Sequence, residues 1–183
     1  AEAEAGARFR CVEYAEVLAA ALGAVGVPAR VLGLQRADVE TAERDAGHVV
    51  AEAWLRDAQR WMLVDGQFDT VAMRGADPLS ARELQSALAE NDPALRIESF
   101  SGMPGGAYKL WIAPYLHFYM RSGRRWTTGA PAGMPSLMLI PPGASPPKVF
   151  QRRFPQHYRR ATESVGAFYA PPPRCDQPLR RSS

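Results

Sequence analysis

The sequence lacks the features that several classes of protein require. Its 183 residues contain only two cysteines, Cys11 and Cys175, so it is not a disulfide scaffold. No run approaches the roughly 18 apolar residues that a membrane span needs, and no basic segment precedes an apolar one at the N-terminus. A zinc site built from Cys11, His48 and His117 would lack the close ligand spacing of known sites, and no acidic cluster suggests calcium. We therefore expect no membrane span, no metal and no other cofactor.

What remains fits one globular domain followed by a tail. The composition is 46% hydrophobic and 22% charged, which is ordinary for a globular chain of this length. From residue 148 onward there are eight Lys or Arg and two Asp or Glu, whereas the preceding residues carry 14 and 17. We divide the chain into a domain over 1–147, with core motifs at 8–70 and a β-rich extension at 71–147, and a basic, proline-rich tail over 148–183.

The chain begins without a methionine, and a candidate nucleophile already stands at position 11. We expect a truncated or processed N-terminus, so a signal peptide could have preceded these residues. The sequence assigns neither a compartment, cytoplasmic or exported, nor an oligomeric state.

Hydrophobic periodicity predicts the elements that would hold a site. The predicted elements are a helix over 11–25, a strand over 27–34, a loop over 35–47, a hairpin with strands 48–55 and 61–65, a helix from a capping box at Ser80 to about Glu90, and strands over 95–101, 110–120 and 136–140. A two-residue turn in the hairpin would pair Trp54 with Trp61. In that register His48 and Asp65 are diagonal neighbours on one face of the sheet, within reach of each other.

Three side chains in this region have the chemistry of a thiol enzyme. Cys11 begins a helix, where unpaired N–H groups and the helix dipole stabilise a thiolate. His48 can hold and return the proton, and Asp65 can orient the imidazole. Asp65 could instead cap the turn that follows it, and Glu52 and Asp69 are rival partners for His48. We predict Cys11, His48 and Asp65 as the catalytic residues, with the N–H of Cys11 as an oxyanion donor.

These residues also carry a resemblance. The stretches RCVEYAEVLAAALGAVGVPARVLGL, AGHVVAEAWL and WMLVDGQFD are similar to the core of the transglutaminase-like superfamily, a branch of the papain-like cysteine enzymes. In that family a cysteine begins a helix, a Gly-x-Pro-Ala-Arg segment leads into a strand, a Gly-His pair starts a second strand and an aspartate ends a third. Cys11, residues 26–30, Gly47 with His48, and Asp65 occupy those positions.

The resemblance implies a fold and an activity. The fold is α+β, with the cysteine helix packed against an antiparallel sheet, here followed by a C-terminal β-rich extension. The activity is thiol-dependent acyl chemistry on amide bonds through a thioester, by hydrolysis or transfer to an amine, with a protein or peptide as substrate. Two departures from the family stand out: Arg10 replaces a small residue, and residues 1–7 hold no aromatic or amide side chain for the oxyanion hole.

Two other functions compete with this interpretation. The chain could be a catalytically inactive transglutaminase-like module for binding or assembly, because the family includes members that have lost activity. The tail segment KVFQRRFPQHYRR interleaves aromatics with arginines, a pattern that can hold single-stranded nucleic acid. We favour a tail whose aromatics anchor it on the domain, and so expect no nucleic-acid partner. Arg30 we interpret as structural, paired with an acidic group near the helix end.

Overall fold

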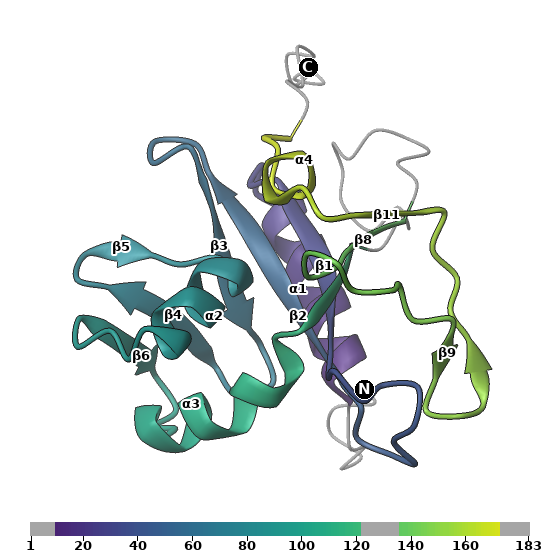
Figure 1. Ribbon diagram of the computed structural model, residues 1–183. Helices are drawn as coiled ribbons and strands as arrows, with labels where there is room; N and C mark the ends of the chain where they lie inside the picture. Colours follow the sequence, from purple (N-terminus) through teal and green to yellow (C-terminus); the bar gives the residue numbers. More distant parts are fainter. Residues whose placement is uncertain (1–9, 122–135, 173–183) are drawn as a thin grey trace, which may run out of the picture.

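The strands of this chain build one large sheet and one small hairpin. The computed structural model describes residues 10–121 and 136–172. The strands are β1 (Ala29–Gln35), β2 (Gly47–Leu55), β3 (Arg60–Asp65), β4 (Thr70–Arg74), β5 (Asp77–Pro78), β6 (Leu95–Ser99), β7 (Phe118–Arg121), β8 (Leu137–Leu139), β9 (Val149–Phe150), β10 (Phe154–Pro155) and β11 (Arg160–Thr162). The nine-stranded sheet has the order β11-β8-β7-β1-β2-β3-β4-β5, and β6 pairs with β4 (Figure 1). Only the β8–β11 pair is parallel among the described strands.

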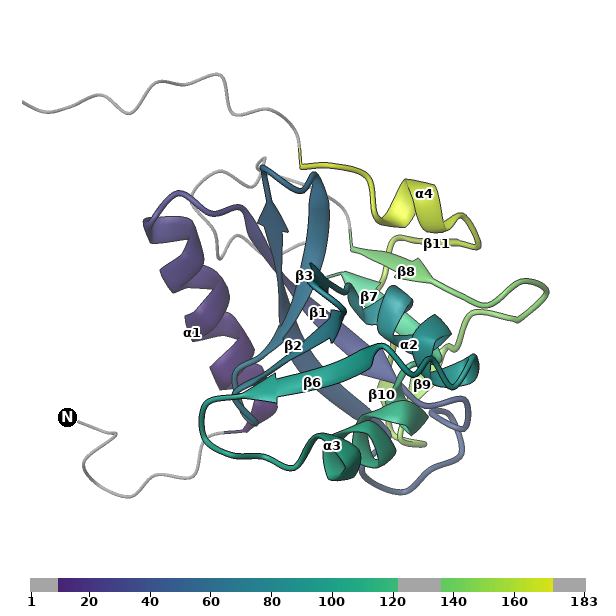
Figure 2. The same ribbon diagram turned by 90° about the vertical axis from the view of Figure 1, so that its left-hand side faces the viewer.

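Helices cover both faces of this sheet. They are α1 (Cys11–Ala24), α2 (Ala81–Ala89), α3 (Gly105–Ile112) and α4 (Val165–Phe168), with a 3₁₀ turn at Ala113–Tyr115. Figure 2 shows α1 on one side of the central strands and α2 and α3 on the other. The fold is thus α+β, with the cysteine helix packed on an antiparallel-rich sheet, as predicted. No helix within the described ranges is long and apolar enough to cross a membrane.

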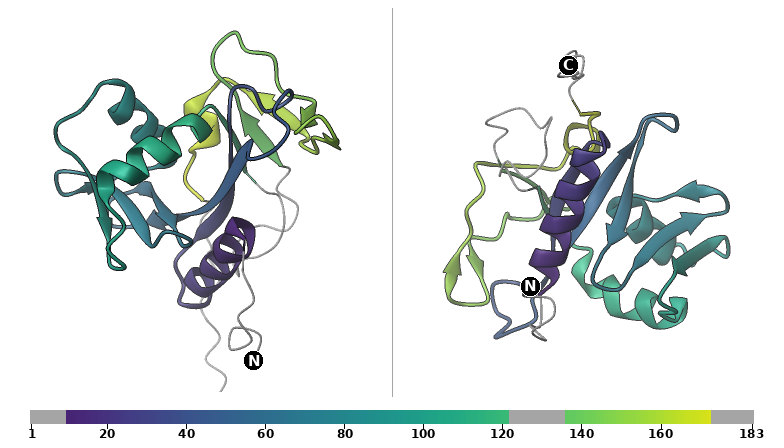
Figure 3. Two further views of the ribbon diagram at one scale, coloured as in Figure 1. Left: turned by 90° about the horizontal axis from the view of Figure 1, so that it is seen from below. Right: turned by 180° about the vertical axis from the view of Figure 1, so that it is seen from behind.

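Small side chains bring α1 close to the sheet. Ala19 of the helix is fully buried against Ala29 of β1 and Ala51 of β2. Alanine favours helix and leaves room for the strands to approach, so α1 lies flat across β1 and β2 (Figure 3, right). This contact fixes where the helix begins, and with it the position of Cys11.

The opposite face of the sheet carries the main core. The alternate residues Leu32 and Leu34 of β1 and Val50 of β2 point there and are fully buried. Tyr108 and Ile112, one turn apart on α3, close over them. Each fully buried residue of this size contributes roughly 1.5–3 kcal/mol, so this face supplies most of the hydrophobic stabilisation.

The predicted hairpin register is confirmed. Trp54 pairs with Trp61, and the ladder between β2 and β3 ends at the pair of Ala51 and Val64. The capping box before α2 is also confirmed, because Ser80 Oγ accepts from the Glu83 N–H while the Glu83 carboxylate accepts from the Ser80 N–H.

The strand predicted over 110–120 is wrong. Residues 105–112 form α3, Pro114 lies in the following 3₁₀ turn, and only Phe118–Arg121 is extended. The apolar run here buries Tyr108 and Ile112, four residues apart, which is helical spacing. Continuous hydrophobicity does not distinguish a buried helix from a strand, and that ambiguity caused the error.

The described part of the tail packs on the rest of the chain. β11 adds to the edge of the sheet beside β8, and Phe168 of α4 is fully buried in the main core. Trp61 Nε1 donates to the carbonyl of Ala170 at 3.2 Å. Of the aromatics in the segment KVFQRRFPQHYRR, Phe150 and Tyr158 pack against the domain as expected, whereas Phe154 is exposed. Cys175 lies outside the described residues.

A buried ion pair locks this segment in place. Both Nε and Nη2 of Arg30 donate to Oε2 of Glu52, at 2.8 and 2.6 Å, and Nη1 donates to the Phe168 carbonyl. The guanidinium also lies 4.1 Å from the ring centroid of Trp61 and 4.7 Å from that of Tyr169. Arg30 is structural, as predicted, but its partner is on the neighbouring strand, not near a helix end.

Loss of one member of this pair should cost far more than loss of a surface pair. We expect Arg30→Met to lower the free energy of unfolding by about 3–5 kcal/mol, because Glu52 would remain charged and buried. The matched variant Arg36→Met breaks the exposed pair with Asp38 and should cost below about 1 kcal/mol. Urea unfolding measures both. Adding Glu52→Gln to Arg30→Met should recover part of the loss, and equal costs for Arg30→Met and Arg36→Met would contradict the assignment.

Candidate active site

His48 and Asp65 meet where β2 and β3 separate. Nε2 of His48 lies 2.7 Å from Oδ2 of Asp65. Both side chains are buried, with 3% and 0% of their surface exposed. The pairing of β2 with β3 stops at Ala51, so the start of β2 and the end of β3 diverge around these residues. The diagonal relation expected from strand alternation thus brings the two side chains into contact.

Cys11 reaches the same point from the other side of the sheet. The first turn of α1 lies over the end of β3, where a side chain on Gly66 would meet Tyr14 and Leu18 of the helix. The thiol of Cys11 lies close enough to His48 and to the backbone of Val49 and Val12 for all three to lower its pKa. Since Nε2 of His48 faces Asp65, Nδ1 is the ring nitrogen left for the sulfur. The three predicted residues therefore lie together in the order thiol, imidazole, carboxylate.

The electrostatics of the site favour a charged thiol and imidazole. Burial raises the pKa of Cys11, but the hydrogen bond and charge of His48, with two backbone N–H groups, outweigh it, so the pKa is lowered. Burial lowers the pKa of His48, yet Asp65 and Cys11 together raise it to about 9. Between these two pKa values the pair is thiolate and imidazolium, with the titrations belonging to the pair as a whole. A half-buried cysteine with a lowered pKa ionises more readily, and the thiolate is the nucleophilic form.

The Asp65 carboxylate is fully bound. Oδ1 accepts from the N–H of Gln67 at 3.0 Å and of Phe68 at 3.4 Å, which is the turn-capping role considered from the sequence. Oδ2 accepts from the hydroxyl of Tyr108 at 3.0 Å as well as facing His48. Capping the turn and orienting the imidazole are therefore compatible, because each uses a different oxygen.

Aromatic side chains enclose the imidazole. The Trp111 ring meets the His48 ring edge-on with centroids 4.7 Å apart, and Phe68 and Tyr115 lie 6.0 and 6.1 Å away. Sequence reasoning missed Tyr108, Trp111 and Tyr115. Their spacing of three and four residues in YKLWIAPY was an available signal for one helical face. The wrong strand assignment concealed it.

The rival partners for His48 have other roles. Glu52 binds Arg30, and Asp69 accepts from the N–H of Ser101 at 2.7 Å. His117 is half-buried, and its ring lies 4.5 Å from that of Phe118, at 89°. Within the described residues, no group of three or more His, Cys, Asp or Glu side chains is arranged to hold a metal ion.

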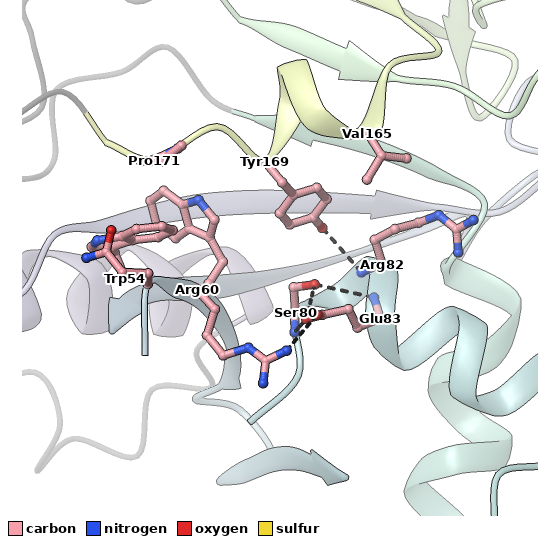
Figure 4. A pocket seen from close by; sticks show the side chains of 10 residues that line it. Trp54, Arg60, Ser80, Arg82, Glu83, Val165, Tyr169 and Pro171 are labelled. Carbon is pink, nitrogen blue, oxygen red and sulfur yellow. Dashed lines mark hydrogen bonds and ion pairs between the residues drawn. The ribbon is translucent and has the colours of Figure 1, made fainter. Parts of the chain in front are cut away.

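A pocket of ≈ 260 Å³ lies at the other end of β2, away from Cys11. His48 and Trp54 are six residues apart, roughly 20 Å along the strand. Figure 4 shows Arg60 reaching Glu83 and the Tyr169 hydroxyl pointing to Arg82, so these polar groups of the wall are paired within the protein. The residues that line it are Trp54, Gln59, Arg60, Trp61, Ser80, Arg82, Glu83, Val165, Tyr169 and Pro171. The pocket belongs to the Arg30 end of the fold.

An α+β fold in which a thiol, an imidazole and a carboxylate lie in that order is the arrangement typical of papain-like cysteine enzymes in general. The comparison with family models agrees, since residues 5–66 match the transglutaminase-like superfamily. The matched residues make up about the first third of the chain. Comparisons with curated proteins and with solved structures found no match.

Alkylation of Cys11 should follow the charge of the pair. In a Cys175→Ser background, where Cys11 is the sole thiol, we expect the midpoint of its reaction with iodoacetamide to lie below pH 8.5, the ordinary pKa of a thiol. His48→Gln should move the midpoint above that value, since burial alone raises the pKa of Cys11. His117→Gln is the matched control and should change nothing. A midpoint that His48→Gln leaves unmoved would refute the pairing.

Gly47 holds His48 in place by having no side chain. A Cβ there would lie 3.0 Å from the Phe150 ring and 3.1 Å from the carbonyl of Leu34. We expect Gly47→Ala to cost about 1–3 kcal/mol in urea unfolding and to slow alkylation of Cys11 at pH 7. Gly33→Ala on β1, whose Cβ would find only ordinary contacts of 3.7 Å, should do neither. Equal behaviour of the two variants would show that the close contact with Phe150 has no effect.

Proposed function

We propose that this protein performs thiol-dependent acyl chemistry on amide bonds, with Cys11, His48 and Asp65 as catalytic residues. One observation carries the proposal: the half-buried thiol of Cys11 lies beside the imidazole of His48, and Nε2 of that ring lies 2.7 Å from a buried carboxylate. The match of residues 5–66 to the transglutaminase-like superfamily supports it. We also propose a domain over 1–147 followed by a segment over 148–183, of which β11 and Phe168 pack into the domain.

The proposed reaction has two halves. The Cys11 thiolate attacks the amide carbonyl carbon, and the backbone N–H of Cys11 donates to the oxyanion that forms. The imidazolium of His48 gives its proton to the leaving nitrogen as the C–N bond breaks, which leaves a thioester on Cys11. His48, now neutral, takes a proton from water or from an amine, and that nucleophile displaces the sulfur. Asp65 holds the imidazole in orientation and stabilises its charged form throughout.

Trapping the thioester tests this function directly. Chain carrying Cys175→Ser is mixed with a peptide library, quenched in acid and digested, and mass spectrometry locates the acyl group. We expect an adduct on Cys11 that hydroxylamine removes. His48→Gln should lower the rate of its formation by about 10²–10⁴-fold, because general acid and base catalysis is lost.

Two controls separate catalysis from simple reactivity. Cys11→Ser/Cys175→Ser should give no hydroxylamine-sensitive thioester, and His117→Gln should acylate at the normal rate. A chain that binds library peptides without acylating, while Cys11 remains alkylatable, would reject the enzyme and favour the binding module. The amine or water that releases the acyl group is then identified from the products.

A further inference from the structure

Tyr108 and His48 meet on the same carboxylate oxygen. The Tyr108 hydroxyl donates to Oδ2 of Asp65 at 3.0 Å, and Nε2 of His48 lies 2.7 Å from that atom. Burial first, and the charge of Asp65 second, raise the pKa of Tyr108 far above its usual range. The hydroxyl therefore keeps its proton and remains a donor to Asp65.

The helix that carries Tyr108 is held firmly. Lys109 Nζ donates to the Leu95 carbonyl of β6 at 2.6 Å, and a side chain on Gly105 would lie 3.3 Å from Cβ of Ile97. Tyr108 is fully buried. This helix lies beyond residues 5–66, so the contact with Asp65 is made from outside the segment that matches the family model.

We propose that Tyr108 is a positioning residue that limits the hold of Asp65 on His48 by donating to the oxygen that faces the imidazole. A donor on Oδ2 takes up part of its negative charge, so the carboxylate stabilises the imidazolium less. The N–H groups of Gln67 and Phe68 keep Oδ1 in place independently, so Tyr108 acts on the charge of the carboxylate more than on its location.

If the proposed function is correct, Tyr108 affects how readily His48 gives its proton to the leaving nitrogen. The pKa of His48 is already raised to about 9, above the value that best suits an acid working near neutral pH. Other titratable groups at the site are Cys11, against His48, and Tyr115, which faces Cys11 with Asp45 and Arg36 beyond it. Tyr108 is the neutral donor that opposes a further rise.

The test is the titration of His48 in the full chain, followed by NMR of its ring. The chain has three histidines, and His117→Gln and His157→Gln assign the other two signals. We expect Tyr108→Phe to raise the His48 midpoint by roughly 0.5 pH unit. The matched control is Tyr119→Phe, which removes an equally buried hydroxyl that donates to the Leu116 carbonyl at 3.0 Å and should leave the midpoint unchanged. An unchanged or lower midpoint in Tyr108→Phe, or equal shifts in both variants, would overturn the proposal.

Acylation of Cys11 separates this inference from the function beneath it. If an acyl-enzyme forms, Tyr108→Phe should slow it about two- to threefold at pH 7 while Tyr119→Phe does not. If none forms but the midpoint moves in Tyr108→Phe alone, the proposed function fails and the role of Tyr108 at the His48–Asp65 pair stands. If acylation is normal and the midpoint is unmoved in Tyr108→Phe, the role of Tyr108 fails and the function stands.

Discussion

A single buried carboxylate, that of Glu52, joins four parts of this fold. Oε2 accepts both bonds from Arg30 of β1, and Oε1 accepts from the N–H of Ala81 at the start of α2 and from the hydroxyl of Tyr169 after α4. A charge with no exposed surface is tolerated only when all of its partners are present. The first strand, the second helix and the end of the described chain are therefore all needed before β2 can be buried.

Two buried carboxylates, Glu52 of β2 and Asp65 at the end of β3, differ in the cation that each of them faces. Glu52 faces a guanidinium, a group that does not exchange its proton in proteins. This pair can stabilise the fold but cannot take part in proton transfer. Asp65 faces His48, whose pKa is raised to about 9 and whose proton can therefore leave within an accessible pH range. Side chains at residues 48 and 52 lie on one face of the strand, roughly 13 Å apart. The Glu52–Arg30 pair is therefore structural, whereas the Asp65–His48 pair contains a group that can gain and lose a proton.

Alternation of side chains along the strands predicted the contact between His48 and Asp65, but the sequence did not predict the aromatic side chains around them. Alternation along β2 and β3 gave the register of the hairpin, because each strand has one face in the main core and a slip would reverse it. The three residues of the proposed triad followed from that register and the motif order. Tyr108 lies 43 residues from Asp65. The spacing of the aromatics in its segment could indicate a helical face, but no local pattern identifies a partner so distant in the sequence. The partner of Arg30 was misjudged for the same reason, since tertiary packing decides it.

Cys11, His48 and Asp65 differ sharply in how much of each side chain solvent can reach. Cys11 is half-buried, whereas His48 and Asp65 are almost fully enclosed by aromatic rings from α3, the following 3₁₀ turn and Phe68. A carbonyl can approach the sulfur while water is kept from the imidazole–carboxylate bond, where a lower effective dielectric strengthens the interaction. Most of this enclosure comes from residues after 66, beyond the segment that matches the superfamily. The segment that follows the aspartate therefore supplies most of the surroundings of the imidazole in this chain.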